Sequence, residues 1–168
     1  GRYLKEDWIS ISDIGRIYNG IKLDANTYIS VENAYIETIL LILKTKRIKN
    51  LLIKNLALRV SIDELLNEIH KCDYIDLYTY ELLDLYRKLE KYIDQNKTLK
   101  NIINLDITDI GNFCRLLLRE DVRGMPLYPK KLKIYICYDY LMTIYSSTSL
   151  DALIPLIEKQ GLFVEYFE

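Results

Sequence analysis

Residues 27–56, TYISVENAYIETILLILKTKRIKNLLIKNL, contain the pattern that decides the fold of this chain. From Thr27 to about Lys46 the apolar side chains recur at helical spacing, with Glu32 and Glu37 in the polar gaps. These apolar positions are Ile29, Val31, Tyr35, Ile36, Ile39, Leu40 and Leu43. Basic residues end the pattern, where they complement the helix dipole, and residues 51–56 are typical of a β-strand. The stretch therefore predicts a helix followed by a strand.

Further elements are predicted on both sides of this unit. Residues 8–12 alternate apolar and polar side chains, which predicts a short half-buried strand. Ser61 and Glu64 have the spacing of a capping box, so a helix is expected to begin there. The tyrosine-rich residues 73–80 are interpreted as a strand, and residues 81–93 have the apolar spacing of a helix.

The second half of the chain begins with another helix. Asp106 or Thr108 is expected to cap it, and it is expected to end near Gly124. Pro126 and Pro129 then predict an irregular loop, because proline lacks a backbone N–H group.

A period of two over residues 133–145 predicts a long central strand, or two strands bent at Asp139. Ser149 is expected to begin a short helix that Pro155 kinks or restarts. Residues 162–167 are expected to form the final strand.

This order of elements predicts an α/β (α+β) fold, with helices packed on a mixed central sheet. A length of 168 residues fits one domain over residues 1–168 with a single hydrophobic core. The two halves both have the predicted order helix, strand, helix, strand, so a diverged duplication of residues 1–95 and 100–168 is a further hypothesis. The polar residues 94–97 would connect the two halves.

Composition indicates a folded protein of the cytoplasm. The chain is 50% hydrophobic and 28% charged, and its longest apolar run, residues 39–43, is far below the roughly 18 residues of a membrane span. Cys72, Cys114 and Cys137 are too few and too scattered for a disulfide framework, which favours a reducing compartment. A net charge of −1 gives no electrostatic reason to expect nucleic-acid binding.

The residue types that carry most enzyme chemistry are sparse. The single histidine, His70, is expected to cap a helix, and no phosphate-binding glycine loop or Cys-His metal spacing occurs. We therefore expect no catalytic residue, no metal site and no cofactor. The alternative is a small hydrolase in which residues 120–121, Asp139 and Glu165 bring carboxylates together. Ion pairing is the preferred interpretation of residues 119–121.

Tyrosine enrichment has two interpretations, packing on the sheet and contact with a protein partner. Tyr135 and Tyr145 lie opposite the apolar row of residues 133–145 and are expected to be exposed. Stacking on nucleic-acid bases is a third hypothesis, with Lys130, Lys131 and Lys133 nearby.

Two pairs of stretches and one single stretch of the chain are similar to known sequence motifs. Residues 18–23 and 28–35 are similar to an opening F-x-G-x-x-L … Y-x-x-V-E-x-x-Y. Residues 118–121 and 136–142 are similar to L-R-E-D … G-Y-D-Y-Y-M-Y, and residues 161–168 to G-L-F-V-E-x-F. Together they resemble a group of small bacterial immunity proteins found beside contact-dependent growth inhibition and Rhs-type polymorphic toxins. The chain differs from this pattern at Cys137, where glycine is expected, and at Leu141, where an aromatic residue is expected.

The resemblance implies a cytoplasmic antidote that binds and neutralises the toxin domain of its cognate effector, often a nuclease, without enzyme activity. Acidic residues would then mimic phosphate in a basic cleft. The expected partner surface consists of Asp73, Asp76, Tyr78, Glu81, Asp84 and Asp139. For Asp139 a structural hydrogen bond is the first interpretation. The alternatives are the carboxylate-based hydrolase and an adaptor subunit without a toxin partner; direct nucleic-acid or membrane contact is not expected.

Overall fold

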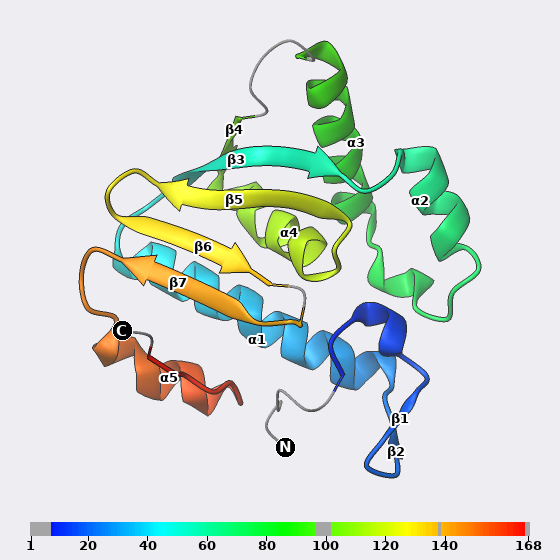
Figure 1. The fold of residues 1–168 in the computed structure, drawn as a ribbon, viewed down its shortest axis with the longest axis horizontal. Helices are drawn as coiled ribbons and strands as arrows, with labels where there is room; N and C mark the ends of the chain where they lie inside the picture. The colour runs from blue at the N-terminus through cyan, green and yellow to red at the C-terminus, as the bar shows by residue number, and fades with distance from the viewer. Residues whose placement is uncertain (1–7, 97–101, 138, 167–168) are drawn as a thin grey trace.

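The computed structural model describes residues 8–96, 102–137 and 139–166 and has an α+β fold (Figure 1). Its helices and strands alternate irregularly along the chain. In order they are η1 (Ile11–Asp13), β1 (Ile17–Tyr18), β2 (Ile21–Lys22), α1 (Ala25–Thr45), β3 (Asn50–Leu58), α2 (Ile62–Ile69), η2 (Ile75–Leu77), α3 (Tyr80–Gln95), β4 (Ile103–Asp106), α4 (Ile107–Leu118), β5 (Val122–Tyr128), β6 (Leu132–Ile136), β7 (Met142–Ser146), η3 (Asp151–Leu153) and α5 (Ile154–Lys159).

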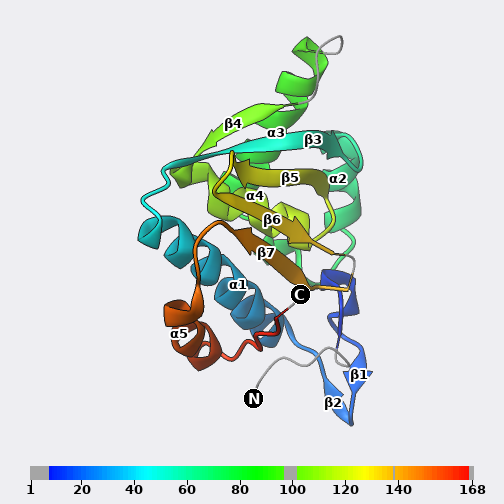
Figure 2. The same ribbon diagram turned by 60° about the vertical axis from the view of Figure 1, so that its left-hand side comes forward.

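One five-stranded sheet organises the molecule, with strand order β4-β3-β5-β6-β7. Helices α1 and α4 cover one of its faces, and α3 lies beside α4 (Figures 1 and 2). No helix in the described part of the chain covers the other face, which we call the open face. The expected α+β class is confirmed. The expectation of a mixed sheet is wrong, because every neighbouring pair of strands is antiparallel.

The hydrophobic core lies between the sheet and helices α1 and α4. Ile39 and Leu43 of α1, Phe113 of α4 and Ile53 of β3 are each at most 1% exposed. Gly124 of β5 lets these layers approach closely, because a Cβ atom there would lie 2.7 Å from Ile53 Cγ2. The predicted helix at 27–46 is thus confirmed as α1, and the predicted strand at 51–56 as β3.

Polar side chains cap the N-termini of three helices. Ser61 accepts a hydrogen bond from the Glu64 backbone N–H at 3.2 Å, and Asp106 accepts one from Thr108 at 3.1 Å. Thr79 does the same for α3. Each satisfies a backbone donor that has no partner inside the helix. The expected caps at Ser61 and Asp106 are therefore confirmed.

Two predicted strands before α3 are wrong. In residues 8–12 the chain bends into η1, because the Ser12 N–H donates to the Ser10 hydroxyl and the Ile9 N–H donates to Asp13 Oδ2. Residues 73–80 form a turn and η2, and α3 begins at their end. Such local side-chain bonds compete with strand pairing, and they decide the outcome at Ser10.

The alternating residues 133–145 form a hairpin, so a single long strand is wrong. Strands β6 and β7 pair in register, with Ile134 opposite Ile144 and Tyr135 opposite Thr143. Asp139 lies in their connection, as the alternative with two strands expected, but the chain reverses there rather than bending. Tyr138, which belongs to the predicted apolar row, lies outside the described residues.

Two boundaries after α4 also differ from expectation. Helix α4 ends at Leu118, well before Gly124, and the expected loop at Pro126 is part of β5. The sheet accommodates Pro126 because β5 pairs with β6 only at Leu127 and Tyr128, after the proline. The predicted final strand is wrong for residues 162–166, which form no strand; residue 167 lies outside the described residues.

The diverged duplication of residues 1–95 and 100–168 stays a prediction. In the first half α1 is followed by β3, α2, a 3-10 turn and α3, whereas in the second half α4 is followed by three consecutive strands. Strand β3 lies between β4 and β5, so both halves build the same sheet.

Two glycines provide a matched test of this packing. We expect Gly124→Ala to lower the free energy of unfolding by about 1–3 kcal/mol, because its Cβ would overlap Ile53. Gly111→Ala in α4 should leave stability unchanged or raise it by up to about 1 kcal/mol, since the nearest atom would be 3.4 Å away and alanine favours helix. Urea unfolding of both variants measures the difference; equal effects would contradict the close approach at Gly124.

Candidate binding surfaces

A fully buried carboxylate, Glu32 of α1, is held by four polar contacts. Arg119 binds both of its oxygens, at 2.7 Å from Nη2 and 2.9 Å from Nε. Arg115 Nη1 donates at 2.8 Å, and the Tyr28 hydroxyl donates at 2.7 Å. Burial alone would raise the pKa of Glu32, but the hydrogen bonds and charge of Arg119, together with the hydrogen bonds from Arg115 and Tyr28, hold that pKa below its ordinary value. The carboxylate therefore stays ionised and internally paired.

Four aromatic rings extend this network toward the β6–β7 connection. The Tyr140 hydroxyl donates to the Tyr28 hydroxyl at 3.1 Å, and the Tyr35 hydroxyl donates to the Tyr140 carbonyl at 2.7 Å. Trp8 lies 5.0 Å from both the Tyr28 and Tyr140 ring centroids. Burial raises the pKa of Tyr28 and Tyr140 well above the ordinary value, so both remain neutral donors.

The turn after α4 directs two charged side chains inward. The Glu120 N–H bonds to the Leu117 carbonyl and the Asp121 N–H to the Leu116 carbonyl, both at 3.0 Å, with Glu120 in the left-handed region. Arg119 consequently points to Glu32, whereas Glu120 is exposed. The expected ion pairing of residues 119–121 is confirmed for Arg119 and Asp121.

Asp121 is the second buried carboxylate. Its Oδ2 accepts from the Tyr78 hydroxyl at 2.6 Å, and its Oδ1 from Arg59 at 3.1 Å. Burial raises the pKa of Asp121, although Tyr78, Arg59 and Arg119 act to lower it. Arg59 also binds both oxygens of Glu68. Tyr78, expected on the partner surface, is 8% exposed and lies under Arg119, so that expectation is wrong.

Of the carboxylates proposed for a hydrolase, Glu120 and Asp121 share one cavity, and Asp139 and Glu165 do not line it. Glu120 lines a cavity of about 250 Å³ together with Asp121 and Arg59. Glu165 lines a different cavity of about 390 Å³, and Asp139 lines neither. Asp139 lies half-buried beside Tyr35, whose pKa is raised by burial and by the Asp139 charge.

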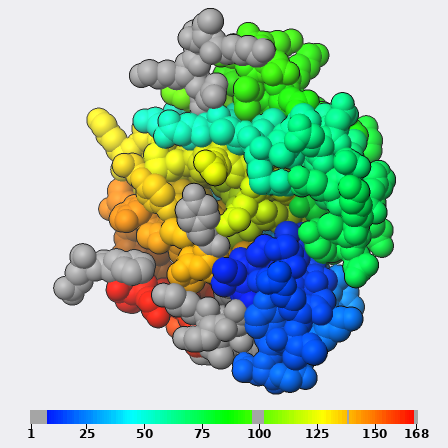
Figure 3. All heavy atoms as spheres, turned by 45° about the vertical axis from the view of Figure 1, so that its right-hand side comes forward, coloured from blue at the N-terminus to red at the C-terminus, as the bar shows by residue number. Residues whose placement is uncertain are grey.

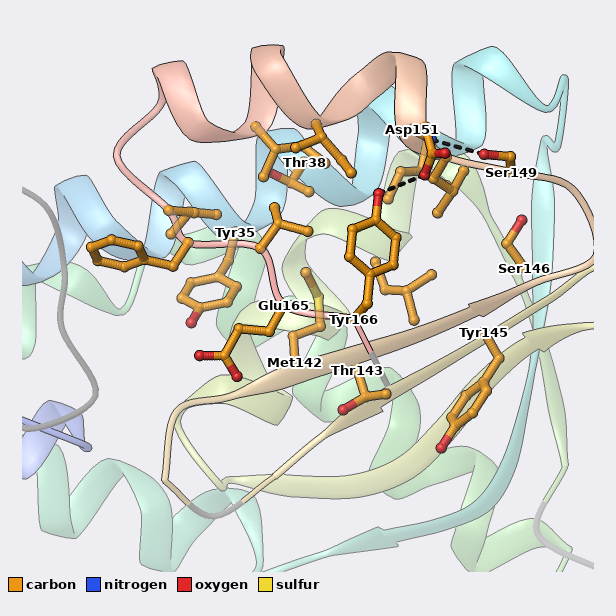
Figure 4. Close-up of a pocket in the computed structure, with 18 of the residues that line it drawn as sticks. Tyr35, Thr38, Met142, Thr143, Tyr145, Ser146, Ser149, Asp151, Glu165 and Tyr166 are labelled. Atoms are coloured by element: carbon orange, nitrogen blue, oxygen red, sulfur yellow. Dashed lines mark hydrogen bonds between the residues drawn. The ribbon is translucent and has the colours of Figure 1, made fainter. Parts of the chain in front are cut away.

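The larger cavity lies between α1, the edge strand β7, α5 and residues 162–166 (Figure 4). Met142, Ile144 and Tyr35 contribute to its apolar walls. At its rim the Tyr166 hydroxyl donates to Asp151 Oδ1 at 2.6 Å, which fastens the C-terminal segment to η3. Its apolar walls suit an apolar group, and Asp151 and Glu165 are among its polar lining residues.

The expected acidic surface is only partly as predicted. Asp73, Asp76 and Glu81 are exposed, and within the described part of the chain none of them forms an ion pair. Asp84 is half-buried and pairs with Lys88 at 3.1 Å. Tyr80, which is not among the residues expected on this surface, is 74% exposed beside these acids. The sequence offers no signal that distinguishes Tyr80 from Tyr78, because the contacts that bury Tyr78 come from Asp121 and Arg119.

The open face is a second surface. Leu52, Leu127, Lys133 and Tyr145 are successive cross-strand partners and therefore point to one side. Tyr135 and Tyr145 are 42% and 57% exposed, which confirms the expectation for both rings. Figure 3 shows the yellow atoms of β5 and β6 at the surface between β3 in cyan and the N-terminal segment in blue.

The remaining reactive side chains are dispersed. His70 caps the C-terminus of α2 and is exposed, as expected. Cys114 is buried, which raises its pKa to about 12, and Cys137 is exposed. Among the described residues no group of three or more metal-binding side chains gathers, and no helix has the length and apolarity that crossing a membrane requires.

Comparison with known proteins finds no similarity. No protein-family model matches the chain, and neither a curated protein nor a solved structure matches it significantly.

Removing one charge from the buried pair should unfold much of this network. We expect Glu32→Gln to lower the free energy of unfolding by about 3 kcal/mol or more, because Arg119, whose side chain is 1% exposed, would stay buried without its partner. The control Asp84→Asn removes a solvent-accessible i,i+4 pair with Lys88 and should leave the urea midpoint nearly unchanged. Similar midpoints for the two variants would contradict a central role for Glu32.

The two buried carboxylates should have opposite pH dependence. Glu32 has a lowered pKa, so its contribution to stability is present above its unfolded pKa and is lost as pH falls through the folded value. Asp121 has a raised pKa, so its contribution is present below its unfolded pKa and is lost as pH rises through the folded value. Urea unfolding of wild type, Glu32→Gln and Asp121→Asn from roughly pH 3 to 8 tests this. As pH rises, the free energy of unfolding lost in Glu32→Gln should increase, and that lost in Asp121→Asn should decrease.

Proposed function

We propose that this chain is an immunity protein that binds and neutralises the toxin domain of a contact-dependent inhibition or Rhs-type polymorphic toxin system, and that it acts in the cytoplasm without a cofactor. The observation that carries this proposal is a surface around Tyr80. Its ring is 74% exposed, and Asp73, Asp76 and Glu81 present carboxylates that have no cationic partner among the described residues.

Such a surface suits contact with a basic protein cleft. Exposed tyrosine supplies contact area at low entropic cost and keeps a hydroxyl for hydrogen bonding. Carboxylates around it would attract a cationic surface and favour its approach over long range. If the toxin is a nuclease, its substrate cleft is basic because it binds phosphate, and these acids would occupy the positions of phosphate groups.

The internal chemistry of the chain supports a binding role over the hydrolase alternative. Glu32 and Asp121 are engaged by arginine and tyrosine inside the fold. Glu120, Asp139 and Glu165 are not gathered around one cavity, which the hydrolase requires. The resemblance of the motifs at 18–35, 118–142 and 161–168 to immunity proteins points in the same direction.

The test is a survival assay with the carboxy-terminal domain of the protein encoded immediately upstream of this chain, which the proposal takes to be the toxin domain. Cells that express that domain should die, and co-expression of this chain should rescue them and yield a stoichiometric complex. Toxicity without rescue, or no toxicity, would contradict the proposal and favour the adaptor subunit or the hydrolase.

Charge reversal should locate the acidic contact. We expect Asp76→Lys with Glu81→Lys to weaken binding of the toxin domain about 10-fold or more, equivalent to roughly 1.4 kcal/mol, measured by titration calorimetry. Glu37→Lys, at an exposed position of α1, is the matched control and should bind as wild type does. Unchanged affinity of the double variant would exclude this surface as the contact.

A further inference from the structure

The open face has a charge unlike that of the whole chain. Lys54, Arg123 and Lys133 are exposed on β3, β5 and β6, and the strand registers put all three on this face. Across β3 to β7 the strands contain one carboxylate, Asp106, which accepts the capping hydrogen bond of α4. A chain of net charge −1 thus concentrates positive charge on one side of its sheet.

Apolar side chains lie between these cations. Leu52 and Leu127 are cross-strand partners, and Met125 lies opposite Lys54. None of the three belongs to the hydrophobic core on the helix side. An antiparallel sheet can expose one face to water, but such a face normally alternates polar residues outward. Leu127 is only 4% exposed, whereas Leu52 and Met125 are half-buried and leave apolar area on this face that a bound partner would cover.

Two tyrosines are already ordered at the β6–β7 side of this face. The Tyr135 and Tyr145 ring centroids are 5.7 Å apart, with ring planes at 82°. This edge-to-face contact holds both rings in place before any partner arrives, which reduces the entropic cost of ordering them on binding.

We propose that the open face is a second contact surface for the toxin domain and that it binds an acidic region of that protein. The inference rests on the proposed function and adds the chemistry of the partner. Lys54, Arg123 and Lys133 would pair with carboxylates, Leu52 and Met125 would supply apolar contact between β3 and β5, and Tyr145 would bind at the edge strand β7. Because the cleft of a nuclease is basic, this acidic region lies outside it.

A protein partner fits these residues better than single-stranded nucleic acid does. Bases need flat aromatic surfaces, and in the described part of this face the exposed rings of Tyr135 and Tyr145 meet edge to face. The middle of the face carries aliphatic side chains, which offer neither a stacking surface nor a phosphate contact. Apolar groups flanked by tyrosine and arginine are the arrangement found at protein–protein contacts.

The experiment measures affinity for the upstream-encoded toxin domain by titration calorimetry, at low and high salt. Lys54→Glu with Lys133→Glu should weaken binding about 10-fold or more at low salt, with a smaller loss at high salt. Tyr145→Ala should weaken binding about 10-fold at both salt concentrations. Lys91→Glu, an exposed charge reversal on α3, is the control and should leave affinity unchanged. Urea unfolding confirms that each variant is folded.

Each outcome has one meaning. If wild type does not bind the toxin domain, both the function and this inference are overturned. If wild type binds and the open-face variants bind equally well, only this inference is overturned. A fluorescent single-stranded oligonucleotide serves as the competing probe. If wild type binds it and Lys54→Glu with Lys133→Glu does not, while toxin affinity is unchanged, the face belongs to nucleic acid and the inference is wrong.

Discussion

The ion pair between Glu32 and Arg119 is the constraint on which the rest of the structure depends. It joins the middle of α1 to the end of α4, the two helices that cover the sheet. The same arginine donates to the Leu77 carbonyl, and the same glutamate accepts from Tyr28, which contacts Tyr140. One buried charge pair thus positions η2 and the β6–β7 connection, segments that carry few backbone bonds of their own.

The charged groups that stabilise the interior are therefore different from the charged groups at the surface. The buried acids Glu32 and Asp121 are satisfied inside the fold, and no buried side-chain nitrogen or oxygen in the described residues lacks a hydrogen-bond partner. At the surface, Asp73, Asp76 and Glu81 lie around Tyr80, and Lys54, Arg123 and Lys133 lie on the open face. Surfaces of opposite charge fit a binding protein whose partner is itself electrostatically polarised.

The local elements were predictable where short-range physics decides them. Helical periodicity located α1 and α3, and single hydroxyl or carboxyl caps located the starts of α2 and α4. Predictions failed where two local signals compete. Alternation at residues 8–12 suggests a strand, but serine and aspartate side chains bind the backbone there and turn it into η1. Pro126 suggests a loop, but it lies in β5. The sheet accepts it because the pairing of β5 with β6 begins one residue later, at Leu127.

The sequence by itself determined the α+β class, the helix starts and the exposure of Tyr135 and Tyr145, because periodicity and capping act over a few residues. Only the tertiary structure decided that Tyr78 is buried and Tyr80 exposed, since Arg119 and Asp121, some 40 residues away, bind the former. It also decided that Lys54, Arg123 and Lys133 share one face. Strand register sets that grouping, and register depends on pairing between segments that the chain order does not bring together.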